Sequence, residues 1–539
     1  MLLTYKINRD NRDPLNFRAK KKSMLIFFSI ITVAVNAAPV VPNVQKLFDL
    51  IDARQKAFDI PGMAVSVIEP INSDGPGKRK LSFHTKGFTN IDTKQPFTTT
   101  TLFPCASMTK LMTAHAVGVL VDSKNTTWEQ PISTNYRIHF NNATWNDTVN
   151  LLDLLSHRTG LDPLMEWAAA DLPVDDIITA AEQAPSVSTF RDSFNYNNHF
   201  FSLVGRMMSK GSSDPFDGWK ALIKTHIFDK LGMNSSTVEA SDYFKGENTA
   251  FPHLYSPEPI SSNGSYVVKP KNVTSWAFTK VAPAAGVVSS IEDFSKWLSY
   301  LLDSFKGNAK TQIVSKESHD MIFKNHTKEF QYGLGVFSAS FGNETFYSHT
   351  GDADGVTSIF CLFPKTDLAL VIVHNSNNKA LFGDAECAHI FEVLVHGNGT
   401  RMETRTSFTS SFWDQTVGMT NNLARSVRDY VKNQTTNTTL PIESYIGVFN
   451  STGSDKYGFN VTLVNSWPLI LNFEVVYPFK VQPTLPSYKS YKMLHQGGDG
   501  FSIIYGTHSF PSSGDVKFVI EKEKVVGINI TAPLPLSNF

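Results

Sequence analysis

The chain has 539 residues, of which 41% are hydrophobic, so it can form a sizeable packed core and more than one domain. Lysine and arginine together number 49, and aspartate and glutamate together also number 49. This balance excludes the broad positive field that nucleic acids or acidic lipids require, and it excludes an acidic tail.

Residues 1–38 have the layout of a secretory signal. A basic stretch precedes an apolar run from Met24 to Val35, and small residues follow at Ala37 and Ala38. The run is shorter than the roughly 20 residues that span a bilayer. We therefore expect a cleaved signal, with a signal anchor as the alternative, and predict a secreted, extracellular protein without a stable membrane span.

Asn-x-Ser/Thr acceptor sites for N-glycosylation are frequent along the chain, which fits export through the secretory route. The candidate sites are Asn125, Asn142, Asn146, Asn234, Asn263, Asn272, Asn325, Asn343, Asn398, Asn433, Asn437, Asn450, Asn460 and Asn529. Their density predicts a heavily glycosylated protein.

From residue 43 to residue 397, strand patterns lie at both ends and helical patterns lie between them. The runs MAVSVIEP (63–70) and TSIFCLFPKTDLALVIVHN (357–375) are typical of strands, and IEDFSKWLSYLLDSF (291–305) has helical periodicity. This order favours an α/β domain with one sheet built from distant segments and covered by helices.

Two further regions complete the predicted organisation. Residues 398–441 combine one amphipathic helix, FWDQTVGMTNNLARSVRDYV, with the glycosylated linker KNQTTNTTLP. Residues 442–539 contain the short strand runs YIGVFN, FNVTLV, LILNFEVV, FSIIYG and VKFVIEKEKVVGINIT, which predict a small all-β domain.

The chain has only three cysteines, Cys105, Cys361 and Cys387, which is too few for a disulfide framework. A single bridge between Cys361 and Cys387 is one interpretation, and three buried thiols is the other. We assign Cys105 to the core.

The segment SMTKLMTAHAVGVLVD, which begins at Ser107, is apolar on nearly every face, as in a buried central helix. Ser107 and Lys110 are then one turn apart at the helix N-terminus, where the backbone N–H groups and the helix dipole favour a developing oxyanion. Desolvation lowers the pKa of a lysine in such a place, so that it can accept a serine proton. The alternative is that Ser107 only caps the helix.

A second Ser-x-x-Lys tetrad, Ser376-Asn-Asn-Lys379, shows that the pattern alone is weak. It follows a strand run and has the composition of a turn, without a helix N-terminus. We therefore interpret Ser376 as a turn residue.

Several motifs together resemble the serine β-lactamase-related family, which includes class C β-lactamases, penicillin-binding proteins, D-amino-acid peptidases and esterases. The similar segments occur in the family's order and are IPGMAVSVI, TLFPCASMTK, LLDLLSHRTGL, FNYNNHFFSLVG, IFDKLGMNSS, PAAGVVSSIEDFSKWL, YGLGV and HTGDADG. They cover most of residues 45–397. The resemblance implies a β-lactamase/transpeptidase-like antiparallel sheet flanked by helices, with a helical subdomain.

The resemblance also implies roles for individual residues. Ser107 would be the nucleophile that forms the acyl enzyme, and Lys110 and Tyr196 would share the work of the base. Asn198 would orient the substrate or hold Lys110. His349 could hydrogen bond to the Tyr196 hydroxyl.

The last motif would bind the substrate and the oxyanion. The backbone N–H groups of Ser107 and Asp352 would form the oxyanion hole, and Thr350 and Gly351 would contact the substrate. The family's reaction needs no cofactor, and the sequence contains no metal-binding motif.

This chain departs from the penicillin-recognising members, which commonly carry Lys-Thr-Gly where it has His349-Thr350-Gly351. A histidine is only partly charged near neutral pH, and Asp352 and Asp354 oppose an anionic ligand. Recognition of β-lactams or of D-Ala-D-Ala is therefore doubtful, while acyl transfer remains open.

Two nearby features have plainer interpretations. The sequence GDADG (351–355) resembles the start of a calcium loop, but Phe363 stands where the bidentate glutamate would be required, so we predict a turn. His157 ends a predicted helix before a glycine turn, and we predict a structural role for it.

The sequence thus favours a secreted serine hydrolase that cleaves a neutral or basic ester or amide, with a small molecule or peptide as substrate. The alternative from another class is a catalytically weak or inactive extracellular matrix component, such as a shell matrix protein, with matrix partners. A true β-lactamase is the third interpretation.

Overall fold

The computed structural model describes residues 42–396 and 440–531, apart from short gaps. The gaps are residues 58–59, 72–77, 135, 137, 139, 141–142, 162–173, 176–181, 183–185, 187, 210–212, 258–265, 271–279, 329, 354, 377–383, 451–457, 467–468, 477–489, 498–499, 505–512 and 522–523. The predicted signal at 1–38 and nearly all of the predicted linker at 398–441 lie outside the described residues.

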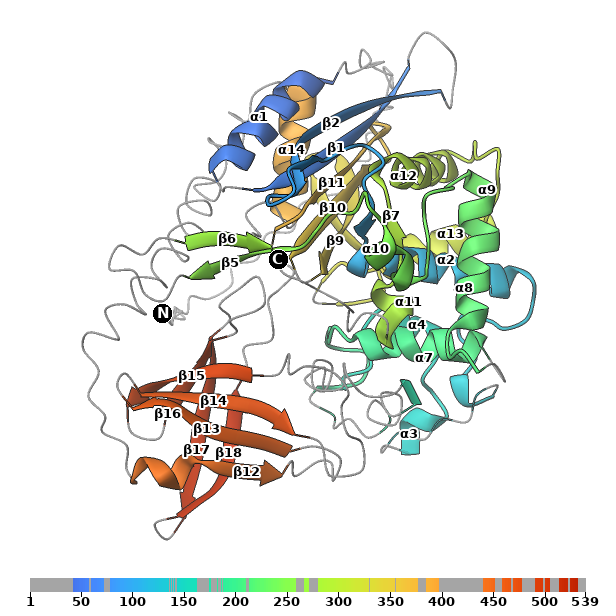
Figure 1. Ribbon diagram of the computed structural model, residues 1–539. Coiled ribbons are helices and arrows are strands. Elements are labelled where there is room, and N and C mark those ends of the chain that lie inside the picture. Colours follow the sequence, from blue (N-terminus) through green and yellow to red (C-terminus); the bar gives the residue numbers. More distant parts are fainter. Residues whose placement is uncertain are drawn as a thin grey trace, which may run out of the picture. The chain divides into compact units, whose positions relative to one another are not determined.

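A seven-stranded antiparallel sheet forms the centre of residues 42–396 (Figure 1). Its order is β3-β2-β1-β11-β10-β9-β8. The strands are β1 (Gly62–Pro70), β2 (Arg79–Asn90), β3 (Gln95–Pro96), β8 (Phe337–Phe341), β9 (Glu344–Ala353), β10 (Val356–Phe363) and β11 (Leu368–His374). The two ends of the domain sequence therefore meet in one sheet, as predicted. The structure adds that β1 pairs with β11.

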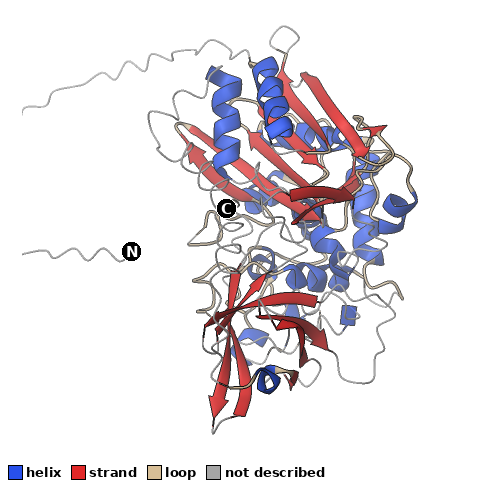
Figure 2. Ribbon diagram, turned by 60° about the vertical axis from the view of Figure 1, so that its left-hand side comes forward, coloured by secondary structure: helices blue, strands red, loops and turns tan. Residues whose placement is uncertain are grey.

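Helices cover both faces of this sheet, which explains why β1, β10 and β11 are apolar along nearly their whole length rather than alternating (Figure 2). On one face, alternate residues such as Val65 and Ile372 pack in a cluster with α1 (Val44–Ala57) and α14 (Asp384–His396). On the other face, their neighbours Ala64 and Val373 join the larger cluster that contains the central helices.

The central helices lie between β3 and β8 in the chain. They are α2 (Thr109–Asp122), α3 (Ala143–Asn146), α4 (Leu151–Leu155), α7 (Asn198–Met208), α8 (Asp217–Ile223), α9 (Asp229–Leu231), α10 (Ala240–Lys245), α11 (Ala282–Ala285), α12 (Ile291–Phe305) and α13 (Lys316–Phe323). Short 3-10 helices lie at η1 (Ala106–Met108) and η2 (Ile132–Thr134), and η3 (Lys224–Phe228) is a π-helical turn. Two small antiparallel pairs, β4 (Phe103–Pro104) with β7 (Val288–Ser289) and β5 (His253–Pro257) with β6 (Tyr266–Pro270), complete this region. The predicted fold class, an antiparallel sheet flanked by helices, is confirmed.

Cys361 on β10 and Cys387 on α14 form a disulfide, with their Cα atoms 5.7 Å apart. Of the two interpretations that the sequence left open, the structure therefore shows the bridge. Cys105 is a free thiol that is fully buried in the larger core cluster, as predicted.

The C-terminal part is an antiparallel meander in which each strand pairs with the next. After η5 (Ile442–Tyr445), the strands are β12 (Gly447–Asn450), β13 (Gly458–Ser466), β14 (Leu469–Val476), β15 (Ser490–Gly497), β16 (Gly500–Ile504), β17 (Ser513–Glu521) and β18 (Lys524–Thr531). The sequence pattern did not reveal β15, whose residues SYKMLHQG are largely polar, and it showed β17 and β18 as one run.

None of the helices in the described part of the chain combines the length and the apolar character that a membrane crossing requires.

Candidate active site

Ser107 lies in the short 3-10 turn η1, directly before the buried helix α2. Met108 occupies the N-cap position of α2, and no side chain caps that helix. The alternative that Ser107 is merely an N-cap is therefore wrong. The residue before it, Ala106, has a φ of +45°, a left-handed conformation that strains a residue with a side chain by about 1–3 kcal/mol. Such strain is common where a backbone turn presents a functional group.

Lys110 is fully buried one turn further along, and its Nζ has three hydrogen-bond acceptors. It donates to Ser107 Oγ over 2.9 Å and to the carbonyl oxygen of Ala284 over 3.2 Å, and it also donates to Asn198 Oδ1. The structure thus brings together Ser107, Lys110 and Asn198, as the sequence predicted, and adds a backbone carbonyl that the sequence gave no sign of.

Close packing of α11 against α2 and α7 positions the acceptors around Lys110 (Figure 1). Thr113, on α2, donates through its hydroxyl to the Pro283 carbonyl over 2.6 Å and accepts from Trp219 Nε1 over 2.8 Å. On α7, a Cβ at Gly205 would lie only 2.2 Å from the Pro283 ring, so a glycine is required there for the two helices to approach. Asn198 from α7 and Ala284 from α11 consequently reach the same amine.

Tyr196 lies just before α7, and its hydroxyl donates to Ser107 Oγ over 2.6 Å. The intervening residue, Asn197, caps α7 by accepting from the backbone N–H of His199 over 2.8 Å. This cap explains the Tyr-x-Asn spacing, because it lets the tyrosine before the helix and the asparagine at its first position turn toward one centre. Lys110 Nζ is also 4.6 Å from the centroid of the Tyr196 ring.

Side-chain exposure differs among these groups in a way that suits catalysis. Ser107, Tyr196 and Asn198 are partly exposed, whereas Lys110 is buried behind them. A substrate can therefore reach the hydroxyl groups while the amine stays out of water.

The His157 ring packs against the ring of Tyr196. Its ring centroid is 4.4 Å from that of Tyr196, and its Nδ1 accepts from the backbone N–H of Asn197 over 3.0 Å. Burial, and then the charges of Lys110 and His349, hold the pKa of His157 well below its ordinary value. His157 is therefore a neutral imidazole that holds the Tyr-x-Asn segment, which agrees with the structural role expected for it.

His349 lies on β9, fully buried, with both ring nitrogens in hydrogen bonds. Nε2 is 3.1 Å from the Tyr332 hydroxyl, and Nδ1 is 2.7 Å from the carbonyl oxygen of Thr350. Burial first, and then the charge of Lys110, lower the pKa of His349 from 6.5 to about 3. The sequence expectation was a hydrogen bond to Tyr196, but the two bonds found here go elsewhere, and the Tyr196 ring centroid lies 6.2 Å away.

Tyr332 is a site residue whose role sequence reasoning missed. The only signal for it was the segment YGLGV, one of the segments that resemble the family, which indicated no role for its tyrosine. A pattern of this kind does not show which buried group a phenol will meet.

Strand β9 passes directly against the turn that carries Ser107. A Cβ at Gly351 would be 2.3 Å from the carbonyl oxygen of Cys105, so only a glycine allows this approach. Thr350 and Asp352, on either side of Gly351, are partly exposed. The oxyanion hole expected from the N–H groups of Ser107 and Asp352, and the substrate contacts expected from Thr350 and Gly351, stay predictions.

Several predicted features lie outside the described residues. They are Asp354, Asn377 to Lys379 of the second tetrad, and the glycosylation candidates Asn142, Asn263, Asn272, Asn398, Asn433 and Asn437. The serine of that tetrad, Ser376, is fully buried, with its Oγ 3.2 Å from His374 Nδ1.

The other glycosylation candidates fall in the described part. Asn125, Asn234, Asn325 and Asn343 are exposed, Asn146 is half-buried, and Asn450, Asn460 and Asn529 lie on strands of the C-terminal sheet. Among the side chains of the described residues, no group of three or more histidine, cysteine, aspartate or glutamate residues could hold a metal ion.

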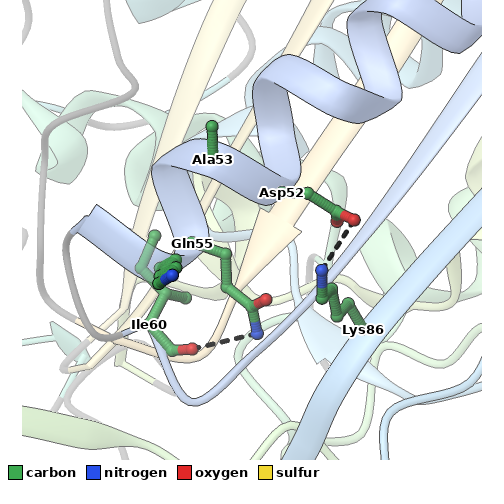
Figure 3. A pocket seen from close by; sticks show the side chains of 6 residues that line it. Asp52, Ala53, Gln55, Ile60 and Lys86 are labelled. Atoms are coloured by element: carbon green, nitrogen blue, oxygen red, sulfur yellow. Dashed lines mark hydrogen bonds and ion pairs between the residues drawn. The ribbon is translucent and has the colours of Figure 1, made fainter.

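A surface pocket of about 650 Å³ lies between α1 and β2 (Figure 3). Its lining residues are Asp52, Ala53, Gln55, Lys56, Ile60 and Lys86. Asp52 and Lys86 form an ion pair of 2.6 Å across it. Because α1 packs on the face of the sheet opposite to α2, this pocket is separate from the site at Ser107.

Comparison with known proteins agrees with this geometry. The family model described as "Beta-lactamase" matches residues 47–394, well over half of the chain. The chain belongs to the beta-lactamase family. Its homologues in this family are serine hydrolases.

Two curated relatives illustrate the range of the beta-lactamase family. An unguisins hydrolase of Aspergillus campestris is 25% identical over 378 residues, which are 65% of this chain and 65% of that protein. This chain therefore spans slightly less than two thirds of that relative. Protein flp of Staphylococcus aureus is 20% identical and covers 69% of this chain and 70% of its own length.

Two solved structures share the fold. The penicillin-binding protein homologue from Pyrococcus abyssi aligns with 91% of this chain and 98% of its own, with a TM-score of 0.54 and 19% identity. The D-amino acid amidase from Ochrobactrum anthropi, solved with L-phenylalanine amide, covers 62% of this chain and 91% of its own, with a TM-score of 0.51 and 20% identity.

Proposed function

We propose that this chain is a secreted serine hydrolase that cleaves an ester or amide through an acyl enzyme on Ser107. The proposal depends on one observation: two groups contact the same serine oxygen. Lys110 Nζ lies 2.9 Å from Ser107 Oγ, and the Tyr196 hydroxyl lies 2.6 Å from it. A nucleophile within hydrogen-bond reach of its base, with the base held by a third group, is the arrangement that acyl transfer requires.

The reaction proceeds in two steps. In the first, Ser107 Oγ attacks the substrate carbonyl carbon and its proton passes to whichever of Lys110 and Tyr196 is unprotonated when the substrate is bound, as a neutral amine or a phenolate, because both contact the same oxygen. That proton then goes to the leaving alcohol or amine as the bond to the acyl group breaks. In the second step, water gives a proton to the same groups and attacks the ester on Ser107, which releases the acid and restores the hydroxyl.

The negatively charged oxygen that forms in each step needs hydrogen-bond donors to stabilise it. We assign this role to the backbone N–H groups of Ser107 and Asp352, because the contact between Gly351 and Cys105 brings β9 against η1. Loss of one such donor typically costs about 10²–10³ in kcat.

The charge of the site favours a neutral or basic acyl group. His349 stands where a lysine would supply a fixed positive charge, and its pKa of about 3 leaves it uncharged. Asp352, partly exposed beside it, would oppose a carboxylate. The amidase relative was solved with an amide that carries no carboxylate, which is in keeping with this preference.

Secretion is part of the proposal because of three further features. Disulfides persist mainly in oxidising compartments, and Cys361 and Cys387 form one. The density of N-glycosylation sequons and the signal-like residues 1–38 point the same way.

A substrate panel tests the function. We expect short-chain nitrophenyl esters to be hydrolysed much faster than chromogenic cephalosporins, and Ser107→Ala to abolish both activities. A clear preference for the cephalosporin would instead identify a true β-lactamase. A folded protein that hydrolyses no ester or amide in the panel would favour the matrix alternative.

A further inference from the structure

The hydrogen bonds of His349 determine where its proton lies. Nδ1 is 2.7 Å from the Thr350 carbonyl oxygen, which can only accept, so Nδ1 carries a hydrogen. The ring is 1% exposed and its pKa is lowered to about 3 by burial and by Lys110, so it is neutral at physiological pH. A neutral imidazole has one N–H, so Nε2 is left as an acceptor.

The partner of Nε2 is therefore a donor, and that partner is the Tyr332 hydroxyl, 3.1 Å away. Tyr332 is fully buried, with ring centroids 4.5 Å from Phe337 and 5.2 Å from His157, so its phenol has a fixed direction. Burial, and then Tyr196, raise the pKa of Tyr332 well above its ordinary value, and it keeps its proton.

We propose that Tyr332 is a positioning residue that donates to Nε2 of His349 and so keeps this nitrogen from presenting a donor or a cation beside the nucleophile. Both nitrogens of His349 are occupied, one by Thr350 and one by Tyr332. Tyr332 would then act through His349 to disfavour substrates that carry a carboxylate at this position. This effect on substrate choice rests on the proposed function.

The groups around His349 agree with a neutral ring. The titratable side chains that face it are Lys110 from α2, His157 after α4, Tyr196 before α7 and Tyr332 before β8. Lys110 opposes a second positive charge, and His157 and Tyr332 are neutral. Without the Tyr332 hydroxyl, Nε2 loses its donor while Nδ1 keeps the Thr350 carbonyl, so a second proton on Nε2 is then less disfavoured.

The tautomer is measured by ¹H–¹⁵N spectra of the full chain labelled with ¹⁵N-histidine, with His349→Gln used to assign the signal. We expect the Nδ1–H pattern for His349 at every pH between about 5.5 and 8 in the unmodified protein. Tyr332→Phe should keep the hydrogen on Nδ1, which still faces the Thr350 carbonyl, and shift the ¹⁵N signal of Nε2 toward that of a nitrogen without a hydrogen-bond donor. Tyr243→Phe removes another buried hydroxyl, one that donates to the Ala250 carbonyl, and should leave the signal unchanged.

An Nε2–H or imidazolium pattern for His349 in the unmodified protein overturns the inference, and so does an unchanged ¹⁵N signal of Nε2 in folded Tyr332→Phe. If Tyr332→Phe does not fold, the spectrum of the unmodified protein decides. Because these spectra need no turnover, they stand even if the proposed hydrolase activity fails.

A kinetic comparison tests the effect on substrate choice. We expect Tyr332→Phe to shift the ratio of kcat/KM for an anionic ester, nitrophenyl hydrogen succinate, over neutral nitrophenyl acetate upward by about three- to tenfold, the value of one neutral hydrogen bond. Tyr243→Phe should leave the ratio as it is. An equal ratio in Tyr332→Phe and the unmodified protein contradicts the specificity role.

Discussion

The hydroxyl of Tyr196 donates a hydrogen bond of 2.6 Å to Ser107 Oγ, although 89 positions separate the two residues in the chain. Lys110 donates to the same oxygen from only three positions away. The contact thus joins a local pair on η1 and α2 to a distant segment before α7. These three groups meet only when the segment before α7 has folded against η1 and α2.

Removal of the Tyr196 hydroxyl should slow turnover without unfolding the protein. We expect Tyr196→Phe to reduce kcat for nitrophenyl acetate by about 10²–10⁴, the usual contribution of a positioned acid or base. The ring stays in contact with His157, so the thermal midpoint should change little. Steady-state kinetics and thermal unfolding measure both effects; a variant with full kcat would show that Tyr196 transfers no proton.

Substitutions of Lys110 and of Asn198 should have opposite effects on the free energy of unfolding. Lys110→Met removes a buried charge and fills the same space, so we expect activity to fall by orders of magnitude while stability holds or rises. Asn198→Ala leaves the ammonium without one acceptor, which should cost about 1–3 kcal/mol of unfolding free energy. Urea denaturation compares them, and a strongly destabilised Lys110→Met would contradict this account.

Acid should destabilise the domain through its buried histidines. Burial, as the main cause, lowers the pKa of His115 to about 3 and that of the nearby His319 to about 4. In the unfolded chain these groups take up protons near pH 6.5, while in the folded chain they do so only near pH 3–4. Between these values the unfolded state binds more protons, so stability is full above about pH 6.5 and falls as the pH drops.

For each such histidine, the free energy of unfolding should change by at most about 1.4 kcal/mol per pH unit. Urea denaturation at pH 7.5 and pH 5 measures it. His115→Phe, in an aromatic setting formed by Trp297 and Phe323, should flatten the dependence. His226→Gln, at a partly exposed position, should alter it less. Equal stability at both pH values would refute the prediction.

Two sequons should differ when the protein is made in a secretory host. Asn343 is exposed between β8 and β9, and we expect it to carry a glycan. Asn146 uses both ends of its amide on Phe140, accepting from the backbone N–H over 2.7 Å and donating to the carbonyl over 3.2 Å. We expect it to stay unmodified.

Mass spectrometry before and after deglycosylation tests this difference. Asn343→Gln should lose one glycan and keep its stability, whereas Asn146→Ala should lose no glycan and about 1–3 kcal/mol of stability. A glycan on Asn146 together with a bare Asn343 would reverse the expectation.

Much of the fold could be predicted from the sequence because its main signals are local. The apolar runs of β1 and β11 and the period of α12 are visible in the residues themselves. The disulfide was not decidable in this way, because it depends on the 5.7 Å between two Cα atoms on different elements. Strand β15 was missed because its polar residues carry little strand signal.

At the site, the spacing of Ser107 and Lys110 and of Tyr196 and Asn198 predicted which residues would come together. The sequence could not show that Ala106 takes a left-handed conformation, since tertiary contacts impose that on an alanine. It also could not show that Lys110 donates to the carbonyl oxygen of Ala284, because a backbone group has no sequence signature.

The most direct test of the central claim is covalent labelling with a fluorophosphonate probe, followed by peptide mapping. We predict a single adduct on the peptide that contains Ser107, lost in Ser107→Ala and retained in Ser376→Ala, which alters the serine of the other Ser-x-x-Lys tetrad. Labelling of Ser107→Ala at the level of the unmodified protein would contradict the account.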